Sequence, residues 1–453
     1  MEGQTTTNQP VTFTTQTQYP LPSQKFMIPT NWKRYHLSQL VNKALGLEKS
    51  VPFDFLVRGE ILRSTLAEWC AENGVGEEET LDIEYIESVL PPQKMSEFPH
   101  ESWVSSVSCE LPSHILTAAY DGYLRAFDLS KNVVLSAPIH NAPITSFSIL
   151  PSETTADMDG NSTYTVVTSS QDLTSNISQV TIPTVGSPSS SKVLASLHLH
   201  TAPVSSISAD AKGKQLLTSS WDGLIGLWDT TIPSSDEVPE PETTGGERRK
   251  RRKVQKDESK PKRKAPVNVL KSHVGRVSKV TWTSSSTALS SGFDATVRTW
   301  DVENGVCTRT ISASEKPFLD VAVTPNGQSA LGVSTDRTMT MYDLRATEFS
   351  AATATFLHPS TPSCVAVSGG NTSVNQVVTG SYDGVVRVWD LRSTKAAVAL
   401  FKAWEGKGQK VLSVDWRRDV VAVGGEGGLD VWKVQAGAGG SETGVEARNK
   451  VSA

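Results

Sequence analysis

The sequence predicts a mostly β fold in which seven sheet repeats form a closed ring, preceded by a small α+β domain. Five times an Asp is followed, seven residues later, by a second Asp with an aromatic residue directly before it. When two degenerate copies near residues 172 and 426 are included, every interval but one is 42 to 51 residues, which is typical of architectures that repeat one supersecondary unit. The first ninety or so residues lack this pattern and instead mix short strands with helical periodicity.

Bulk properties restrict the function classes to consider. The chain has 453 residues, 37% of them hydrophobic, and a formal net charge of -5. Its four cysteines lie far apart with no CxxC pair, which indicates reduced thiols in the cytosol or nucleus. The first residues lack a secretory signal, and no apolar run approaches the 18 residues of a membrane span. We therefore expect a soluble intracellular protein without a membrane partner.

Each repeat predicts strands joined by a tight turn. In the copies that begin at Asp121, Asp222 and Asp383, the next residue is Gly, which accepts the positive φ of such turns. Copies near 172 and 426 lack part of the pattern, and counting them gives seven blades. The complete copies begin at Asp121, Asp222, Asp294, Asp336 and Asp383.

These repeats resemble the WD-repeat β-propellers, in which a His, a Ser or Thr, the turn Asp and a Trp are joined by hydrogen bonds within a blade. The resemblance implies a structural role for these residues, so His273, Asp294 and Ser291 should not be interpreted as a catalytic triad. No GxSxG, HExxH or P-loop sequence occurs, and we expect no enzyme activity. The blade residues that carry the resemblance are His200, Asp222, Trp228, His273, Asp294, Trp300, His358, Asp383 and Trp389.

The expected domain limits follow from these patterns. The propeller is predicted to span 102–436, with a linker at 92–101 whose strand closes the ring by pairing into the last blade. Residues 1–10 are expected to be disordered, and the Gly-rich tail 437–453 to be flexible.

One interval between blades is longer than the others and predicts an insertion. The turns at Asp222 and Asp294 are 72 residues apart, and 231–266 contains an acidic stretch and then a basic one without apolar periodicity. We expect a disordered loop between the third and fourth blades. Its basic residues favour a bipartite nuclear localisation signal, contact with rRNA phosphates, or both, whereas a merely solvated loop is the alternative. These residues are Arg248, Arg249, Lys250, Arg251, Arg252, Lys253, Lys260, Lys262, Arg263 and Lys264.

The segment 11–91 predicts a separate domain. We expect a strand from Val11, a second near Phe26, and a helix over 36–45 that ends at Gly46. A strand at 53–57, a short helix over 62–70 and a strand at 81–86 complete the order, which is similar to that of a ubiquitin-like β-grasp domain.

Over about residues 11 to 436, the chain resembles the WD-repeat ribosome biogenesis family of the pescadillo–Bop (PeBoW) complex. The resemblance rests on the segment beginning Pro52-Phe-Asp-Phe-Leu-Val, on Leu81-Asp-Ile-Glu-Tyr-Ile and on Trp103-Val-Ser-Ser. It implies a nucleolar and nucleoplasmic assembly factor for the large ribosomal subunit, with a Bop-type propeller protein, pescadillo, the AAA ATPase midasin and the pre-60S particle as partners. No cofactor of its own is expected.

The resemblance also implies a binding residue in the loop 76–80. In the family, a loop carboxylate of the ubiquitin-like domain completes the coordination of a Mg²⁺ ion held by midasin, and the alignment assigns this ligand to Glu78. Oxygen ligands suit Mg²⁺. Because three glutamates are consecutive, Glu77 and Glu79 are the alternatives in register, and an ordinary solvated acidic turn is the structural alternative.

Two other function classes share features with this sequence. A ubiquitin-ligase substrate receptor would also combine a propeller with a ubiquitin-like fold, but it would bind a cullin adaptor or the proteasome. An enzyme built on a propeller would need titratable groups that converge in the central channel, and the sequence indicates none. Pulldown from nuclear extract discriminates among the three classes.

Overall fold

The computed structural model describes residues 7–76, 78–151, 155–156, 162–183, 189–239, 260–312, 315–346, 352–369, 375–405 and 408–435. These residues form two compact units, and each is described by itself below. In the described parts of the chain, no helix is both long and apolar enough to cross a membrane.

The N-terminal domain contains a mixed five-stranded sheet with the strand order β2-β1-β5-β3-β4. The central strands β1 and β5 run parallel, whereas β3 pairs antiparallel to β5. Along the chain, the elements follow the predicted β-grasp order, with the addition of the two-residue strand β4. Its elements are β1 (Asn8–Thr14), β2 (Lys25–Pro29), α1 (Arg34–Leu45), β3 (Phe53–Val57), β4 (Glu60–Ile61), α2 (Leu66–Asn73) and β5 (Leu81–Glu87).

Two boundaries of this domain differ from the prediction. Strand β1 begins at Asn8, so the last residues of the segment predicted to be disordered are paired with β2. Helix α2 begins at Leu66 and not at 62, because Thr65 forms a capping box with Glu68. The Thr65 hydroxyl accepts from the Glu68 backbone N–H, and the Glu68 carboxylate accepts from the Thr65 N–H.

The core of this domain lies between the sheet and the helices. Phe53, Phe55 and Tyr85 are completely buried, and the rings of Phe53 and Tyr85 meet edge to face with centroids 5.4 Å apart. The helices contribute Leu37 from α1 and Trp69 from α2. Burial of aromatic side chains on this scale is the main favourable term available to so small a domain.

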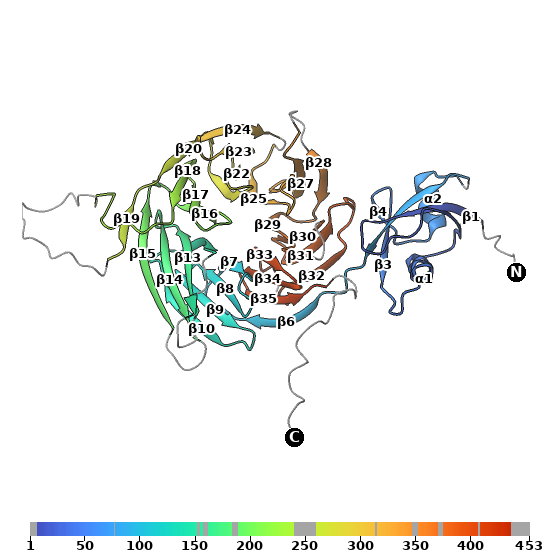
Figure 1. Cartoon of the computed structure of the whole chain (residues 1–453), viewed down its shortest axis with the longest axis horizontal. Helices are drawn as coiled ribbons and strands as arrows, with labels where there is room; N and C mark the ends of the chain where they lie inside the picture. The colour runs from blue at the N-terminus through green and yellow to red at the C-terminus, as the bar shows by residue number, and fades with distance from the viewer. Residues whose placement is uncertain are drawn as a thin grey trace, which may run out of the picture. The chain divides into compact units, whose positions relative to one another are not determined.

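Seven further sheets follow among the described residues, in agreement with the predicted number of blades. Their first strands are in contact around a closed ring, which Figure 1 shows as sheets radiating from a centre. Each first strand contacts that of the next sheet, and the first strand of the last sheet contacts that of the first. The ring of first strands is β7 (Val104–Ser108), β11 (Ile144–Ile149), β16 (Val204–Ala209), β21 (Val277–Trp282), β25 (Phe318–Val323), β29 (Pro362–Val367) and β33 (Val411–Arg417).

The second and third strands are antiparallel to their neighbours in each sheet for which the register is described. The second strands are β8 (His114–Ala119), β13 (Ser162–Ser170), β17 (Gln215–Ser220), β22 (Thr287–Gly292), β26 (Ser329–Ser334), β30 (Gln376–Ser381) and β34 (Val420–Gly425). The third strands are β9 (Tyr123–Asp128), β14 (Thr174–Ile182), β18 (Leu224–Asp229), β23 (Val297–Asp301), β27 (Thr338–Asp343), β31 (Val385–Asp390) and β35 (Gly428–Lys433).

The outer strands complete the sheets. They are β10 (Val133–Pro138), β15 (Ser190–His198), β20 (Asn268–Lys271), β24 (Val306–Ile311), β28 (Ala352–Leu357), β32 (Ala399–Lys402) and β6 (Gln93–Phe98). Strand β6 precedes the propeller in sequence and lies next to β35 in the last sheet, so the ring is closed from the segment in which the sequence predicts a closing strand. Such closure leaves no gap between the first and last blades.

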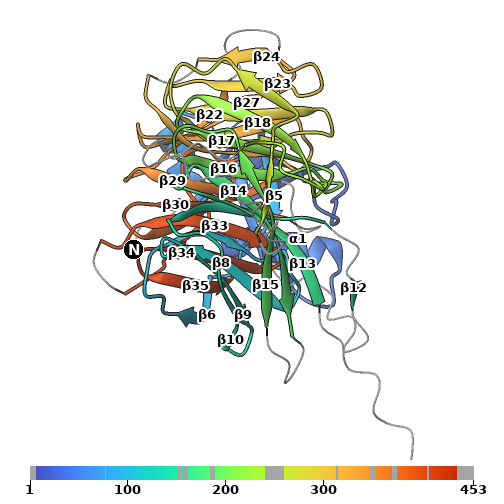
Figure 2. The ribbon, with the colours of Figure 1, turned by 90° about the vertical axis from the view of Figure 1, so that its left-hand side faces the viewer.

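The second sheet is larger than the others. It is extended by the short β12 (Thr155–Ala156), which pairs with β13, and by β19 (Lys262–Lys264), which pairs parallel to the outer strand β15. Figure 2 views this side of the ring, with the long strands β13, β14 and β15 toward the reader.

The predicted position of the insertion is wrong. The insertion lies inside the third blade, between β18 and its outer strand β20, and not between the third and fourth blades. Strand β20 has only four residues, which is too short for an alternating pattern to be recognised in the sequence.

Candidate functional site

The first candidate site is the loop between α2 and β5, which contains the three consecutive glutamates. Helix α2 ends at Gly74, which has a φ of 63°, a left-handed conformation that suits glycine. The Val75 N–H then donates to the Cys70 carbonyl at 2.9 Å, and β5 begins at Leu81. The loop is therefore short, and both of its ends are fixed by regular secondary structure.

A buried glutamine on β1, about 70 residues earlier in the sequence, holds this loop. The side chain of Gln9, on β1, is 1% exposed, and its Nε2 donates to the carbonyls of Gly76 (3.1 Å) and Glu79 (2.5 Å). The Glu79 N–H also donates to the Gly76 carbonyl at 3.2 Å. The backbone is thus fixed on both sides of Glu78.

Two of the three glutamates can be distinguished by their surroundings. The Glu79 carboxylate forms an ion pair with Arg58 at 2.5 Å. Glu78 is exposed, and among the described residues no hydrogen bond or ion pair engages its carboxylate. Glu77 lies outside the described residues. Between Glu78 and Glu79, the geometry favours Glu78 as a carboxylate available to a partner.

The loop suits the donation of one ligand, not the holding of a metal by this chain alone. Among the described residues, no group of three or more His, Cys, Asp or Glu side chains is arranged to hold a metal ion. A single exposed carboxylate on a fixed backbone can instead supply one oxygen to a cation that another protein holds.

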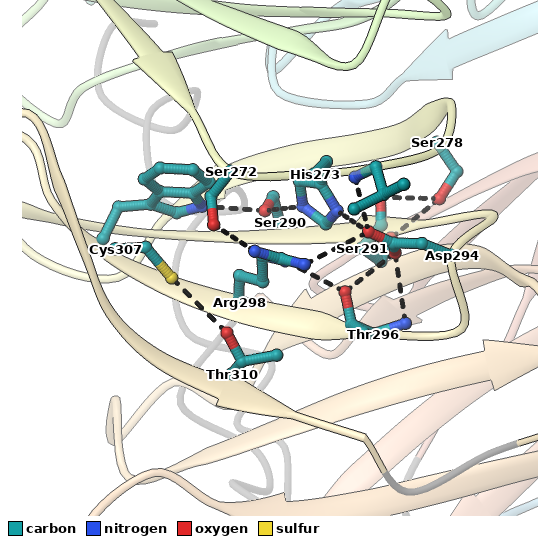
Figure 3. Close-up of polar contacts among 12 residues, drawn as sticks. Ser272, His273, Ser278, Ser290, Ser291, Asp294, Thr296, Arg298, Cys307 and Thr310 are labelled. Atoms are coloured by element: carbon teal, nitrogen blue, oxygen red, sulfur yellow. Dashed lines mark hydrogen bonds and ion pairs between the residues drawn. The ribbon is translucent and has the colours of Figure 1, made fainter.

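The predicted blade residues form buried hydrogen-bond networks, and Figure 3 shows the one in the fourth blade. His273 lies between the Asp294 carboxylate (2.8 Å) and the Ser290 hydroxyl (2.7 Å), and Trp300 Nε1 donates to the same hydroxyl at 2.8 Å. Ser291 lies on the other face of the strand and bonds Ser278, so His273, Asp294 and Ser291 do not form a triad. The alternation of side chains along β22 explains why Ser290 and Ser291 have different partners.

The third blade repeats the same geometry. His200 lies 3.1 Å from Asp222 and 2.8 Å from the Thr218 hydroxyl, to which Trp228 Nε1 donates at 2.9 Å. Burial raises the pKa of the Asp222 carboxyl, but hydrogen bonds from His200 and from backbone N–H groups outweigh it and leave the pKa below its usual value.

The sixth blade uses the same residue types with a different partner for the Asp. His358 lies 2.9 Å from the Thr379 hydroxyl, whereas the Asp383 carboxylate accepts from Arg387 at 2.8 Å. Trp389 is 2% exposed. Burial lowers the pKa of His358 to about 4, so its imidazole is neutral at physiological pH.

The predicted blade residues do not include the histidine of the first blade. His100 Nε2 lies 3.0 Å from the Thr117 hydroxyl, the contact that His200 makes with Thr218. His100 precedes Asp121 by 21 residues, the same interval that separates His273 from Asp294, and this spacing could have identified it.

In the last blade, Gly427 occupies the position of the turn Asp, and the structure explains this difference. A side chain at Gly427 would lie 2.5 Å from the ring of Trp404, which is 3% exposed. The indole therefore fills the space beside this turn, and only glycine fits there.

The second candidate site, the basic insertion, is partly folded. Lys264 is 1% exposed, and its ammonium group bonds the Asp229 carboxylate and the Thr231 carbonyl. The Arg263 N–H donates to Asp236 at 3.0 Å. The prediction of disorder is therefore wrong for Lys262, Arg263 and Lys264, because the edge of β15 and the acidic stretch provide partners that offset the cost of ordering.

This folding changes which basic residues can bind a receptor or RNA. The buried Lys264 is not available to either. Lys260 is exposed. The first basic cluster, Arg248 to Lys253, lies outside the described residues, so its predicted role stays a prediction.

Comparison with known proteins agrees with both parts of the fold. Residues 10–70 match the NLE (NUC135) domain, and residues 191–229, 264–301 and 352–390 match the WD domain, G-beta repeat. The chain is thus a WD-repeat protein with an N-terminal ubiquitin-like NLE domain.

The relatives define the family more closely. The chain is 69% identical to the ribosome biogenesis protein YTM1 of Coprinopsis cinerea over 437 residues, which is 95% of each chain. It is 64% identical to the YTM1 protein of Laccaria bicolor, over 94% of this chain and 95% of that one. The YTM1 protein of Saccharomyces cerevisiae is 32% identical over 86% of this chain and 89% of its own. The chain belongs to the YTM1 family of ribosome biogenesis proteins, which is a non-enzymatic family.

Proposed function

We propose that the chain is an assembly factor for the large (60S) ribosomal subunit that is removed from the particle by force on its NLE domain. The family to which it belongs is named for ribosome biogenesis. In this proposal the AAA ATPase midasin binds the NLE domain and uses ATP hydrolysis to release the factor. The chain itself contributes binding surfaces, and maturation of large-subunit rRNA depends on it through correct particle assembly.

The observation that carries the proposal is the exposed carboxylate of Glu78 on a loop fixed by Gln9. Midasin's own Mg²⁺ would supply a hard cation that accepts one oxygen from outside. Because Gln9 already holds the backbone on both sides of Glu78, little conformational entropy is lost when the carboxylate is engaged. The neighbouring ion pair between Arg58 and Glu79 leaves Glu78 as the free acidic group of the two.

The propeller is the part that anchors the factor. In this proposal it binds a Bop-type WD-repeat protein, itself bound to pescadillo, on the pre-60S particle. The His and Asp side chains of the blades are occupied by hydrogen bonds inside the sheets, as in the fourth blade. Binding therefore falls to exposed side chains on the propeller surface.

The test is the affinity of the full-length chain for the metal-binding adhesion domain of midasin in Mg²⁺ and after chelation. Glu78→Gln removes the charge but keeps the size, and we expect binding to fall about 30-fold or more, since truncating one partner of a desolvated charge contact costs about 2 kcal/mol or more. Glu72→Gln is the matched control, because Glu72 is an exposed carboxylate on α2 of the same domain.

The outcomes separate the three glutamates. Unchanged binding by Glu78→Gln, with loss in Glu79→Gln or Glu77→Gln, would transfer the role to that residue. Binding that is insensitive to all three changes and to chelation would disprove the carboxylate contact.

The site of action in this proposal is the nucleolus and nucleoplasm. Ribosome biogenesis as the family's function and the basic cluster from Arg248 to Lys253 support it. Substitution of the six basic residues by alanine should shift a fluorescently tagged chain to the cytoplasm. Unchanged nuclear fluorescence would exclude this cluster as the import signal.

A further inference from the structure

One face of the propeller carries exposed aromatic side chains at equivalent positions of several blades. In each blade, the residue directly after the second strand donates its N–H to the carbonyl of the residue directly before the first strand. Examples are Phe293 to Arg276 at 2.7 Å and Tyr382 to Thr361 at 3.0 Å. These residues therefore lie at one end of the sheets, which we call the turn face. Its corner positions are Tyr120, Gln171, Trp221, Phe293, Thr335, Tyr382 and Glu426.

Four of these seven positions are aromatic, and three of the four are exposed over about two fifths of their surface. Trp221 is 40%, Phe293 43% and Tyr382 37% exposed. By contrast, the indoles that the blades use for their own stability, Trp228 and Trp300, are 1% exposed. Packing within the blades therefore does not explain the aromatic corners, and exposed aromatic groups that are clustered commonly mark binding surfaces.

The corners of the third and fourth blades form a continuous patch. The Arg276 guanidinium lies over the ring of Trp221, 4.5 Å from its centroid, and the Arg276 carbonyl accepts from Phe293. Val274, in the same loop, is 91% exposed. We call Trp221, Val274, Arg276 and Phe293 the corner patch.

The corner patch has one charge that this chain does not neutralise. Asp222 and Asp294 lie beside it, but their carboxylates accept from His200 and His273 and from backbone N–H groups. Arg276 is exposed, and no ion pair engages it among the described residues. The patch thus combines apolar area with one free guanidinium.

We infer that the corner patch docks an acidic segment of a protein partner, with a partner carboxylate on Arg276 and a partner apolar side chain over Trp221 and Phe293. Trp and Arg are the residue types that contribute most to protein interfaces, and a carboxylate can bind the fork of a guanidinium through two hydrogen bonds. Single-stranded RNA fits less well, because a phosphate chain requires a track of cations, whereas this patch offers one.

This inference rests on the proposed function and adds to it the face by which the propeller is anchored to the pre-60S particle. It predicts that the anchoring contact is weakened by changes on the turn face and not by equal changes at the opposite end of the sheets. Leu129 and Val306 supply that comparison, since they are 63% and 51% exposed and lie beyond Asp128 and Asp301, which pair with the first residues of the second strands.

The experiment measures the fraction of full-length tagged chain that co-sediments with purified 60S precursors. We expect Trp221→Ala and Arg276→Glu each to lower that fraction about tenfold or more. Leu129→Ala and Val306→Ala should leave it unchanged. Because the Arg276 side chain is exposed, Arg276→Glu should not disturb folding. Each variant should unfold at the same temperature as the wild-type chain, which shows that any loss of binding is not caused by misfolding.

Each outcome decides the inference. Wild-type co-sedimentation by both turn-face variants overturns the docking face but leaves the proposed function in place. Loss in the control variants alone moves anchoring to the opposite face and also overturns it. If ribonuclease treatment releases the wild-type chain from the precursors and no other protein stays bound to it, the ligand of the corner patch is RNA and the inference of a protein partner is wrong. A wild-type chain that never co-sediments with the precursors overturns the proposed function together with the inference.

Discussion

The two hydrogen bonds from Gln9 to the loop 76–80, which we call the clamp, give a prediction whose energetic effect can be worked out from the structure. Gln9→Met keeps nearly the same length and apolar stem but removes the Nε2 group, so the carbonyls of Gly76 and Glu79 lose their side-chain donor. Each such hydrogen bond contributes about 1 kcal/mol, and the free energy of unfolding of the NLE domain should fall by about 2 kcal/mol.

The same change should weaken binding of midasin's adhesion domain, although Gln9 touches no partner. If loss of the clamp frees the backbone of one loop residue, ordering it again on binding costs about 1 kcal/mol, or roughly a fivefold loss of affinity. The residual binding should still need Mg²⁺, because Glu78 is intact. Hydrogen exchange of the backbone amides of β1 and β5 in the full-length chain, together with binding by the full-length chain, measures both effects.

Gln18→Met is the control for this experiment. Gln18 is exposed and bonds only the Tyr19 hydroxyl among the contacts that the structure describes, so its loss should change neither stability nor affinity. Gln9→Met with wild-type affinity despite lower stability would refute the argument that the clamp positions Glu78. Wild-type stability in this variant would refute the hydrogen bonds themselves.

Two predictions concern the propeller. Ser290→Ala leaves His273 Nε2 and Trp300 Nε1 without their shared partner, and we expect the free energy of unfolding to fall by about 2 to 4 kcal/mol. The exposed Ser113→Ala is the control, with an expected change below about 0.5 kcal/mol. A change as small as that in Ser290→Ala would argue against the network. Burial lowers the pKa of His358 to about 4. Between about pH 6.5 and 4, the unfolded chain therefore binds a proton at this residue that the native chain does not. The free energy of unfolding should fall by up to about 3 kcal/mol as the pH drops through this range. His358→Gln should flatten this part of the pH profile, and an unchanged profile would show that His358 does not cause it.

The number of blades and the β-grasp order were predictable because both depend on local patterns. Several turns have Gly at a positive φ, as at Gly122 and Gly384, and strands have alternating side chains, so each repeat can be recognised within a few residues. The same locality explains the failures at boundaries. The start of α2 depends on the capping box of Thr65 and Glu68, and a four-residue outer strand such as β20 carries too little pattern to place the insertion.

The roles of individual side chains depended on contacts between residues far apart in the sequence. Three consecutive glutamates look alike in a sequence, and Glu79 differs from Glu78 only because Arg58, 21 residues away, reaches its carboxylate. Likewise, Lys264 looks like part of a basic signal, but an edge strand and Asp229 bury it.

The sequence alone determined the architecture of this protein: repeated turns, alternating strands and a leading β-grasp order, all encoded by neighbouring residues. The tertiary structure decided which of Glu78 and Glu79 pairs with Arg58, which serine bonds His273 and which aromatic corners face solvent. The physical reason is that availability of a side chain is set by the groups that surround it in space, and these come from distant parts of the chain.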